Sequence, residues 1–329
     1  MNRRNFIQNT AQFGLAVSAF GIFSCADSKK SEKQQPKTQE KIEPFFQLSL
    51  AQWSIHKMIM EEGLDPFDFA KKAKQWGFGG LEYVSQLYSK FLEGYENEAE
   101  GMDALVAKLK AESDKYELKN LIIMVDGEGD FAVADDLERN LAVEKHKKWV
   151  KAAKDLGCHS IRVNLFGVTD PETWKQYSVD SLKKLSAYAA PLGVNVLVEN
   201  HGWLSSNGKL LAEVMEEINM QNCGTLPDFG NFCVKRKDGA RWGECEEEYD
   251  RYQGMKEILP YAKAISAKSY DFDESGNETT IDYARMLQMV KDAGYDGYIG
   301  VEYEGDQLNE EQGILATKNL LLKAAEDIS

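Results

Sequence analysis

Three carboxylates stand at the ends of largely apolar runs in this chain. Glu199 follows the apolar residues 196–198 and precedes Asn200 and His201, while Asp228 and Glu302 end two later runs. Burying a charged group is costly unless it is paired, protonated or bound to a metal. Carboxylates can also accept and return protons during catalysis. We therefore expect a site in which acidic side chains bind a cation, a substrate, or both.

Distant residues can meet in such a site only if the fold brings their strands together. From residue 46 onward, apolar runs typical of buried parallel strands alternate eight times with helical segments. This order predicts an α/β fold, a (β/α)8 TIM barrel of a single domain, with its chemistry at the carboxyl ends of the strands. The expected strands cover residues 46–55, 80–84, 118–125, 160–165, 195–199, 224–228, 264–269 and 298–303. The expected helices cover residues 65–76, 98–116, 135–156, 170–191, 208–218, 246–261, 280–293 and 310–325, and a long loop covers 229–244.

Polar residues lie at or just beyond the loop ends of these strands, as a barrel requires. In strand order they are Gln52 and His56, Glu82, Asp126, Asn164, Glu199 and His201, Asp228, Lys268, and Glu302. Oxygen ligands suit Mg²⁺ or Mn²⁺, and a nearby imidazole would extend the choice to Zn²⁺ or Co²⁺. The alternative is that the three carboxylates form structural ion pairs with Lys268, Arg236 or Arg241.

The motifs at residues 198–201, 226–231, 267–268 and 299–303 resemble those of the xylose isomerase-like barrels. More narrowly, they are similar to the sugar phosphate isomerase/epimerase group, which includes ketose 3-epimerases. The resemblance implies a divalent metal, Mn, Mg, Co or Zn, held by Glu199, Asp228 and Glu302. The fourth family ligand is a histidine, and Ser266 stands in its place here. His201 is an alternative source of an imidazole.

The activity implied by the resemblance is proton transfer next to a sugar carbonyl, through an enediolate. Glu199 and Glu302 would form the acid-base pair, one on each face of the reacting carbon. Lys268 would either stabilise the developing oxyanion or neutralise a neighbouring carboxylate. The chain is thus expected to be an isomerase or epimerase.

Further residues near the strand ends are candidates for contact with substrate. Aromatic faces pack against sugar C–H surfaces, so Trp53, Trp203 or Trp242 would provide a platform, with loop packing as the alternative. His56 would line the pocket, with a solvated loop histidine as the alternative. Glu82 would orient the substrate, with an ion pair to a loop cation as the alternative. The substrate-binding candidates are His201, Trp53, His56, Glu82, Asn164 and Asn231.

Two other functions remain open on the same residues. A leaving group β to the carbanion would make the enzyme a lyase or dehydratase acting on a keto-sugar or keto-cyclitol. Ser266 also leaves room for a non-catalytic sugar-binding lipoprotein. A net charge of −15 and four histidines argue against nucleic-acid binding and against an abasic-site endonuclease.

The N-terminal residues read as a targeting segment. Residues 1–24, with Arg3 and Arg4, resemble a twin-arginine signal peptide, and residues 22–25 resemble a lipobox that would make Cys25 a lipidated membrane tether. An ordinary signal peptide with an incidental cysteine is the alternative. Residues 25–44 are predicted to be a flexible linker, and residues 45–329 the barrel. This organisation predicts an exported, periplasmic or outer-membrane-associated lipoprotein that acts on a small sugar or keto-sugar, and a homo-oligomer remains open.

Four more cysteines follow Cys25. Export permits disulfides, and Cys233 and Cys245 flank the long loop that a bond between them would close. Cys158 and Cys223 precede predicted strands and are expected to be buried as small apolar residues.

Overall fold

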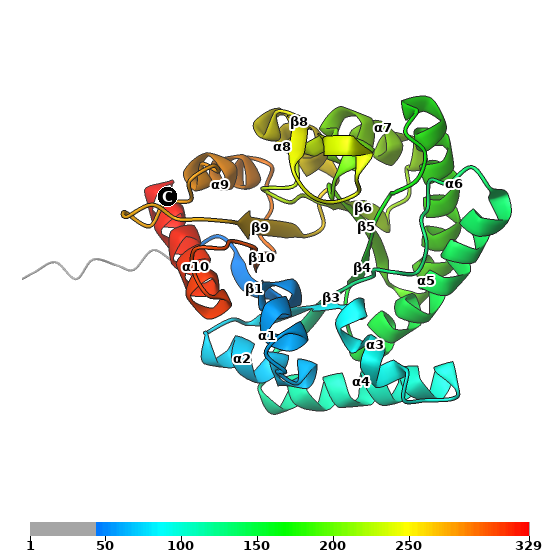
Figure 1. Cartoon of the computed structure of the whole chain (residues 1–329), viewed down its shortest axis with the longest axis horizontal. Helices are drawn as coiled ribbons and strands as arrows, with labels where there is room; N and C mark the ends of the chain where they lie inside the picture. The colour runs from blue at the N-terminus through cyan, green and yellow to red at the C-terminus, as the bar shows by residue number, and fades with distance from the viewer. Residues whose placement is uncertain (1–43, 329) are drawn as a thin grey trace, which may run out of the picture. The chain divides into compact units, whose positions relative to one another are not determined.

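The structure is a computed structural model that describes residues 44–328, and in this range eight parallel strands form a barrel surrounded by helices (Figure 1). The strands are hydrogen-bonded in the order β6-β5-β4-β3-β2-β1-β10-β9. Parallel bridges between Thr225 and Ala262 and between Asp228 and Ser266 join the two ends of this order. The predicted (β/α)8 barrel is thus confirmed. The predicted signal peptide, the lipidated Cys25 and all of the linker but residue 44 lie outside the described residues.

The barrel strands agree closely with those expected. They are β1 Gln47–Ala51, β2 Gly80–Val84, β3 Lys119–Met124, β4 Ser160–Val163, β5 Asn195–Glu199, β6 Cys223–Leu226, β9 Ile265–Ser269 and β10 Tyr298–Tyr303. The α-helices are α1 His56–Met60, α2 Phe69–Gln75, α3 Ser89–Leu92, α4 Glu98–Lys115, α5 Asp136–Leu156, α6 Pro171–Ala189, α7 Gly208–Ile218, α8 Arg251–Ile258, α9 Tyr283–Asp292 and α10 Glu310–Asp327. Residues 52–55, expected to continue the first strand, form a 3-10 helix instead.

Burial on both faces explains the apolar composition of the strands. Val196, Leu197 and Val198 of β5 are all fully buried, with Leu197 in a small apolar cluster and its two neighbours in the large core. This alternation assigns Leu197 to one face of the sheet and its neighbours to the other. The helices α4 to α10 begin at side-chain caps that the sequence supplies, such as Asp170 before Pro171. The caps of the helices and the apolar runs of the strands together determine where the last residue of a strand lies.

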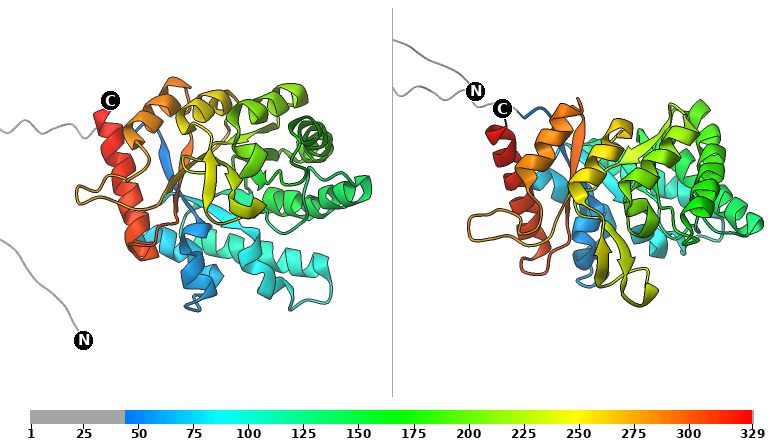
Figure 2. Two further views of the ribbon diagram at one scale, coloured as in Figure 1. Left: turned by 45° about the horizontal axis from the view of Figure 1, so that its top comes forward. Right: turned by 90° about the horizontal axis from the view of Figure 1, so that it is seen from above.

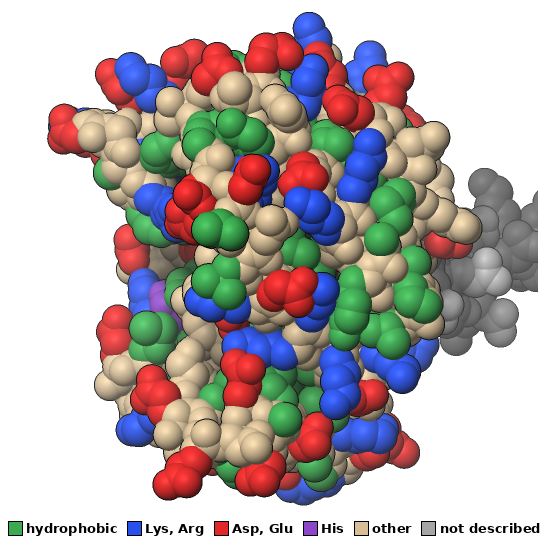
Figure 3. Space-filling model, turned by 90° about the vertical axis from the view of Figure 1, so that its right-hand side faces the viewer, with side chains coloured by type: hydrophobic (Ala, Val, Ile, Leu, Met, Phe, Trp, Pro, Cys, Tyr) green, Lys and Arg blue, Asp and Glu red, His purple; other side chains and the backbone are tan. Residues whose placement is uncertain are grey.

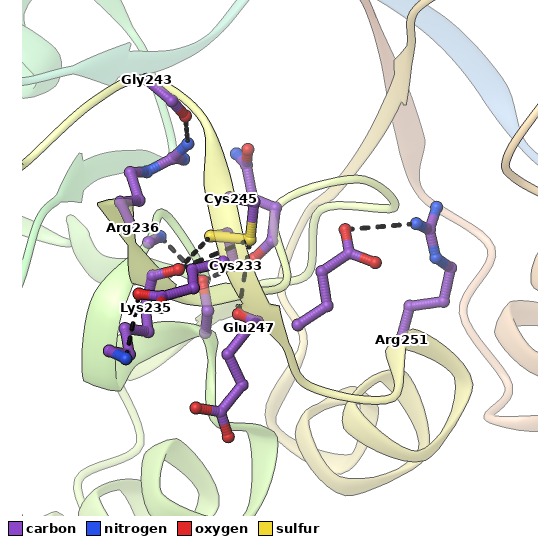
Figure 4. Close-up of a disulfide and its surroundings, with 12 residues drawn as sticks. Cys233, Lys235, Arg236, Gly243, Cys245, Glu247 and Arg251 are labelled. Carbon is purple, nitrogen blue, oxygen red and sulfur yellow. Dashed lines mark hydrogen bonds and ion pairs between the residues drawn. A yellow bond between two sulfur atoms is a disulfide. The ribbon is translucent and has the colours of Figure 1, made fainter. Parts of the chain in front are cut away.

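The predicted helix at residues 246–261 is wrong in its first turn. Residues Cys245–Glu248 form a strand, β8, that pairs antiparallel with β7, Cys233–Arg236. A disulfide joins Cys233 to Cys245, and Lys235 forms an ion pair with Glu246 across the hairpin (Figure 4). A run of glutamates favours a helix locally, but these long-range contacts stabilise the strand. Cys158 and Cys223 are free and buried, as predicted.

The β7–β8 hairpin projects beyond the ring of helices (Figure 2). On the face shown in Figure 3, Lys and Arg side chains alternate with Asp and Glu side chains, without a large area of one sign. Within residues 44–328, no helix combines the length and the apolar character that crossing a membrane requires.

Candidate active site

The three carboxylates expected from the sequence converge at the carboxyl ends of the barrel strands. Glu199 ends β5, Asp228 follows β6, and Glu302 lies near the end of β10. One oxygen atom from each lies within 4.8 Å of the other two, and all three side chains are buried. The fold therefore creates one acidic cluster, called here the triad, from residues that lie up to 103 positions apart in the chain, from 199 to 302.

Ser266 of β9 lies inside this cluster. Its Oγ is 2.6 Å from Asp228 Oδ2 and 3.1 Å from Glu302 Oε2. A hydroxyl carries one proton, so it donates to one of these carboxylates at a time. Ser266 thus links two triad members and presents an oxygen where the resembling family has an imidazole.

Two buried cations contact the triad. Arg162 Nε of β4 is 2.9 Å from Glu199 Oε2, and Lys268 Nζ of β9 is 3.3 Å from Glu302 Oε1. Each cation also serves a second acid: Arg162 pairs with Asp126 at 2.8 Å and Lys268 with Glu304 at 3.0 Å. The two cations therefore contact four carboxylates, and together with Asp228 the cluster keeps an excess of negative charge.

The expected alternative of ion pairs with Lys268, Arg236 or Arg241 holds for Lys268, which pairs with Glu302, and is wrong for the two arginines. Arg236 donates to the carbonyl oxygen of Gly243, and Arg241 pairs with Asp130. Arg162, which does contact the triad, was not among the expected site residues. Its signal is present in the sequence, since Ser160, Arg162 and Asn164 alternate along a short buried strand and must share one face. Glu302 and Glu304 are likewise two residues apart, and Glu304 was also not among the expected site residues.

The excess of negative charge raises the proton affinity of the triad. Burial, reinforced by the neighbouring carboxylates, raises the pKa of Asp228 to about 8 and that of Glu302 to about 7. Burial also raises the pKa of Glu199, although Arg162 opposes the shift. Burial alone would lower the pKa of Lys268, but Glu302 and Glu304 hold it well above its usual value. Lys268 is thus charged while the triad is poised to bind protons.

The same features fit a divalent cation. Converging carboxylates supply hard oxygen ligands of the kind that Mg²⁺ and Mn²⁺ prefer. A cation among Glu199, Asp228 and Glu302 would offset the charge that Arg162 and Lys268 leave uncompensated. The donor set present here is therefore suited to a hard metal ion.

Two asparagines hold the triad in position. Asn231 Nδ2 donates to Glu199 Oε1 at 3.0 Å, and its backbone N–H donates to Asp228 Oδ1 at 2.8 Å. Asn200 accepts from the Asp228 N–H at 2.7 Å and donates to the Asp228 carbonyl oxygen at 3.0 Å. Asn231, expected to contact substrate, thus orients two of the acidic side chains.

Asn164 and His201 extend the polar network into a cavity of about 900 Å³, whose lining includes Glu302 but neither Glu199 nor Asp228. Asn164 Nδ2 donates to Asp126 at 2.7 Å, and its Oδ1 is 2.8 Å from His201 Nδ1. Burial, together with Arg162, lowers the pKa of His201 to about 3, so the imidazole is neutral near pH 7. Both residues line the cavity together with Glu302.

The other expected substrate contacts divide into two groups. Trp53 lines the cavity and stacks on His56, with ring centroids 4.3 Å apart. His56 contacts the Trp53 carbonyl oxygen and Glu310 and is not part of the cavity lining. Glu82 is fully buried, accepts a 2.6 Å hydrogen bond from Ser49, and also lies outside the lining. Of these three residues, only Trp53 reaches the cavity.

The other two tryptophans considered for a sugar platform also differ from each other. Trp242, from the β7–β8 hairpin, lines the cavity and is 51% exposed. Trp203 is not part of that lining, and its buried indole N–H has no hydrogen-bond partner among the described residues. The hairpin therefore supplies an exposed aromatic side chain to the cavity.

Solved structures of sugar epimerases share this fold. The 3-keto-D-glucoside 4-epimerase from E. coli superimposes with a TM-score of 0.63 at 13% identity, covering 85% of this chain and 100% of that one. An L-ribulose 3-epimerase gives 0.62 at 13% identity over 85% and 95% of the two chains. The IolI protein with a bound zinc atom gives 0.62 at 16% identity over 86% and 99%. At these identities the likeness concerns the fold.

Curated relatives match over shorter stretches. The 3'-dehydrocarminate deglycosidase alpha subunit of a Microbacterium is 35% identical over 57 residues, which are 17% of this chain and 16% of the relative. The C-glycoside deglycosidase alpha subunit of Arthrobacter globiformis is 41% identical over 49 residues, 15% and 14% of the two chains. The chain thus spans about one seventh of the length of these two relatives.

A family-wide comparison covers far more of the chain. Residues 70–324 match the family described as xylose isomerase-like TIM barrel, which includes every barrel strand except β1 and all of the triad. On this match the chain belongs to the xylose isomerase-like TIM barrel family.

Proposed function

We propose that this chain is a sugar isomerase or epimerase that works with a divalent metal ion. The observation that carries the proposal is the convergence of Glu199, Asp228 and Glu302 within 4.8 Å in the buried mouth of a barrel. Arg162 and Lys268 compensate only part of this charge. A sugar-binding protein without catalytic activity would have no need for such a cluster of acids, whose burial is costly.

Glu199, Asp228 and Glu302 would hold the metal, with the hydroxyl of Ser266 beside them. When bound, such an ion supplies a positive charge that favours the ionised carboxylates and polarises a sugar carbonyl. The proton is moved by Glu302 and Glu199, one removing it from the carbon next to the carbonyl and the other returning it. Without a bound cation the pKa of Glu302 is about 7, and a cation beside it would lower this pKa and favour the ionised, proton-accepting form.

Neighbouring residues orient this pair. Asn231 and Arg162 fix the Glu199 carboxylate through its two oxygens. Lys268 holds Glu302 and brings a positive charge to the same end of the barrel. Such preorganised charge stabilises negative charge that develops on a substrate oxygen.

The substrate class we propose is a keto-sugar without a phosphate group. The triad and Glu304 make the inner end of the cavity acidic, which disfavours a phosphate beside the reacting carbon. The E. coli neighbour is named for a 3-keto-glucoside, so a 3-keto-glycoside belongs in the substrate panel.

A lyase acting on a keto-glycoside is the second candidate. Two relatives with local matches are deglycosidase subunits, and one is named for a dehydro-glycoside. Removal of a proton from the carbon next to a carbonyl is also the first step in eliminating a leaving group from the adjacent carbon, which is β to the carbonyl. The same carboxylates would serve, and only the fate of the carbanion would differ.

Proton exchange in deuterated water tests both candidates. We expect the wild-type chain with Mn²⁺ to introduce deuterium next to the carbonyl of a keto-sugar, as followed by NMR. Retention of every substituent supports isomerisation or epimerisation, and loss of the β-substituent supports the lyase.

Glu302→Gln should lower the exchange rate by about 10²–10⁴-fold, because the variant cannot accept the proton. Glu311→Gln, at an exposed glutamate of α10, is the matched control and should exchange like wild type. Equal exchange by Glu302→Gln and wild type would contradict the catalytic assignment and favour a binding protein.

The location of the protein is a further part of this proposal. The twin-arginine segment and Cys25 suggest an exported lipoprotein, and the Cys233–Cys245 disulfide is compatible with an oxidising compartment. Cell fractionation should recover wild type with membranes and Cys25→Ser in the soluble extracytoplasmic fraction. Recovery of both proteins from the cytosol would contradict the assignment.

A further inference from the structure

The cavity is larger than one sugar ring requires. Its volume of about 900 Å³ lies near the top of the range of about 300–1,000 Å³ found for pockets that bind drug-sized ligands. Glu302 and Arg162 line its inner end, and Phe166, Trp242 and Arg241 also line it. A sugar ring at the triad would therefore leave part of the cavity unfilled.

Aromatic rings gather along the wall of the cavity. Trp242 lies 5.5 Å from Phe166 in an edge-to-face arrangement and 5.0 Å from His201. His201 also lies 6.3 Å from Phe166, so the three rings form one cluster, called here the aromatic wall. Large exposed apolar side chains are few in the described part of the chain, and both Trp242 and Met60 line this cavity. Exposed apolar surface that is concentrated in a cavity indicates a binding surface.

The hairpin holds Trp242 in this place. The Cys233–Cys245 disulfide joins its two strands below the loop that carries Trp242 (Figure 4). Arg241, the preceding residue, pairs with Asp130 in the loop after β3 and lies over the ring of Phe166 at 4.5 Å. The exposed indole is thus anchored on both sides, which reduces the entropy lost when a ligand stacks on it.

His201 connects the aromatic wall to the triad. Its Nδ1 is hydrogen-bonded to Asn164, which bonds to Asp126, the partner of Arg162. Arg162 in turn contacts Glu199. A ligand ring on the aromatic wall would therefore lie next to a sugar ring positioned for proton transfer.

We propose that Trp242, Phe166 and His201 form a subsite for the second ring of a glycoside whose sugar ring lies at the triad. This inference rests on the proposed function and narrows its substrate class to glycosides that carry a second ring, either a sugar or an aryl group. Both kinds of ring present a face that stacks on aromatic side chains. Free monosaccharides would use only the inner end of the cavity.

Binding of unreactive glycosides tests the subsite without any turnover. The probes are 4-nitrophenyl β-D-glucopyranoside, cellobiose and D-glucose, which lack the ketone, titrated by calorimetry into the full chain with Mn²⁺. We expect at least one two-ring probe to bind about tenfold more tightly than glucose, the gain typical of a stacked ring. Tighter binding of the aryl glucoside alone would assign the second ring as an aryl group. Tighter binding of cellobiose would assign it as a sugar. Equal affinity of all three probes would overturn the proposal.

Substitutions then identify the side chain that gives the two-ring probe its higher affinity. Trp242→Ala should remove the advantage of the two-ring probe while leaving glucose affinity within about twofold, and Trp242→Phe should restore most of it. Tyr188→Ala, which removes an exposed aromatic ring outside the cavity, is the matched control and should bind like wild type. Unchanged discrimination in Trp242→Ala would assign the second ring elsewhere.

The hairpin provides a second, independent variant. Cys233→Ser/Cys245→Ser should weaken two-ring binding and spare glucose, because Trp242 loses its covalent support. Loss of glucose binding as well would show a general structural role and contradict a dedicated subsite. Failure of the proposed function has a different signature, since deuterium exchange would then be absent while the two-ring preference remained.

Discussion

Glu82 is an unusual side chain for the interior of a barrel. It is 1% exposed, its Oε1 accepts from Ser49, and its Oε2 has no hydrogen-bond partner among the described residues. Burial raises its pKa to about 8, with further contributions from Glu302 and Glu199. The folded protein therefore keeps a proton on Glu82 between about pH 4.5 and pH 8, where the unfolded chain releases it.

This difference predicts that Glu82 weakens the fold as pH rises. Stability falls through the window in which the folded state binds more protons, here from about pH 4.5 to pH 8, by up to a few kcal/mol. Glu82→Gln removes the titration, so its melting temperature in EDTA should rise relative to wild type between pH 5 and pH 8.5. Glu311→Gln should follow wild type throughout, and a constant difference between Glu82→Gln and wild type would contradict the shifted pKa.

At the scale of single residues, the sequence predicted the acids better than their partners. Glu199, Asp228 and Glu302 could be found because each ends an apolar strand, which is a local pattern. Arg162 was missed although its alternation with Ser160 and Asn164 is also local. What Asn231 and His56 contact could not be predicted, since their partners Glu199 and Glu310 come from distant elements.

At the scale of elements, the contact between β2 and β10 depends on a glycine. A Cβ on Gly300 would lie 2.5 Å from Glu82 Oε1 and 2.6 Å from Oε2, well inside van der Waals contact. Gly300 also pairs in register with Ser49 of β1 and with Ser266 of β9. The missing side chain thus makes room for the Glu82 carboxyl group beside β10, the strand that carries Glu302.

We expect Gly300→Ala to destabilise the protein by about 1–3 kcal/mol, the usual cost of overpacking a core. Urea unfolding would measure this loss. In a Glu82→Ala background the clashing carboxyl group is absent, so Gly300→Ala should cost clearly less there. Equal costs in the two backgrounds would mean that the strain arises from another neighbour.

Most of the helices could be predicted from the sequence, whereas the β7–β8 hairpin could not. Seven of the eight expected helices coincide with observed α-helices to within a few residues, because caps and apolar periodicity act locally. The segment at Cys245–Glu248 was expected to be helical since its glutamates favour that state. Its strand conformation depends on pairing with Cys233–Arg236 and on the disulfide, which are contacts that local propensity does not describe.

At the scale of the whole molecule, the barrel gathers charge that no single element carries. The triad comes from β5, the residue after β6, and β10, while its two cations come from β4 and β9. Folding therefore brings an excess of buried negative charge into one place, at a cost in stability. A cation that binds there stabilises the entire fold, because the unfolded chain has no such site.

The final prediction follows from this coupling. Mn²⁺ at about 100 times its dissociation constant should stabilise the wild-type chain by about 2.7 kcal/mol relative to EDTA, seen as a higher melting temperature. At one fixed Mn²⁺ concentration, the gain should increase from pH 6 to pH 8, because binding must displace protons from Asp228 and Glu302, whose pKa values are about 8 and 7. Asp228→Asn should lose most of the gain, while Glu311→Gln should retain it. A melting temperature that Mn²⁺ leaves unchanged at pH 8 would contradict a metal site in this barrel, and the excess charge would then have to be balanced by protons alone.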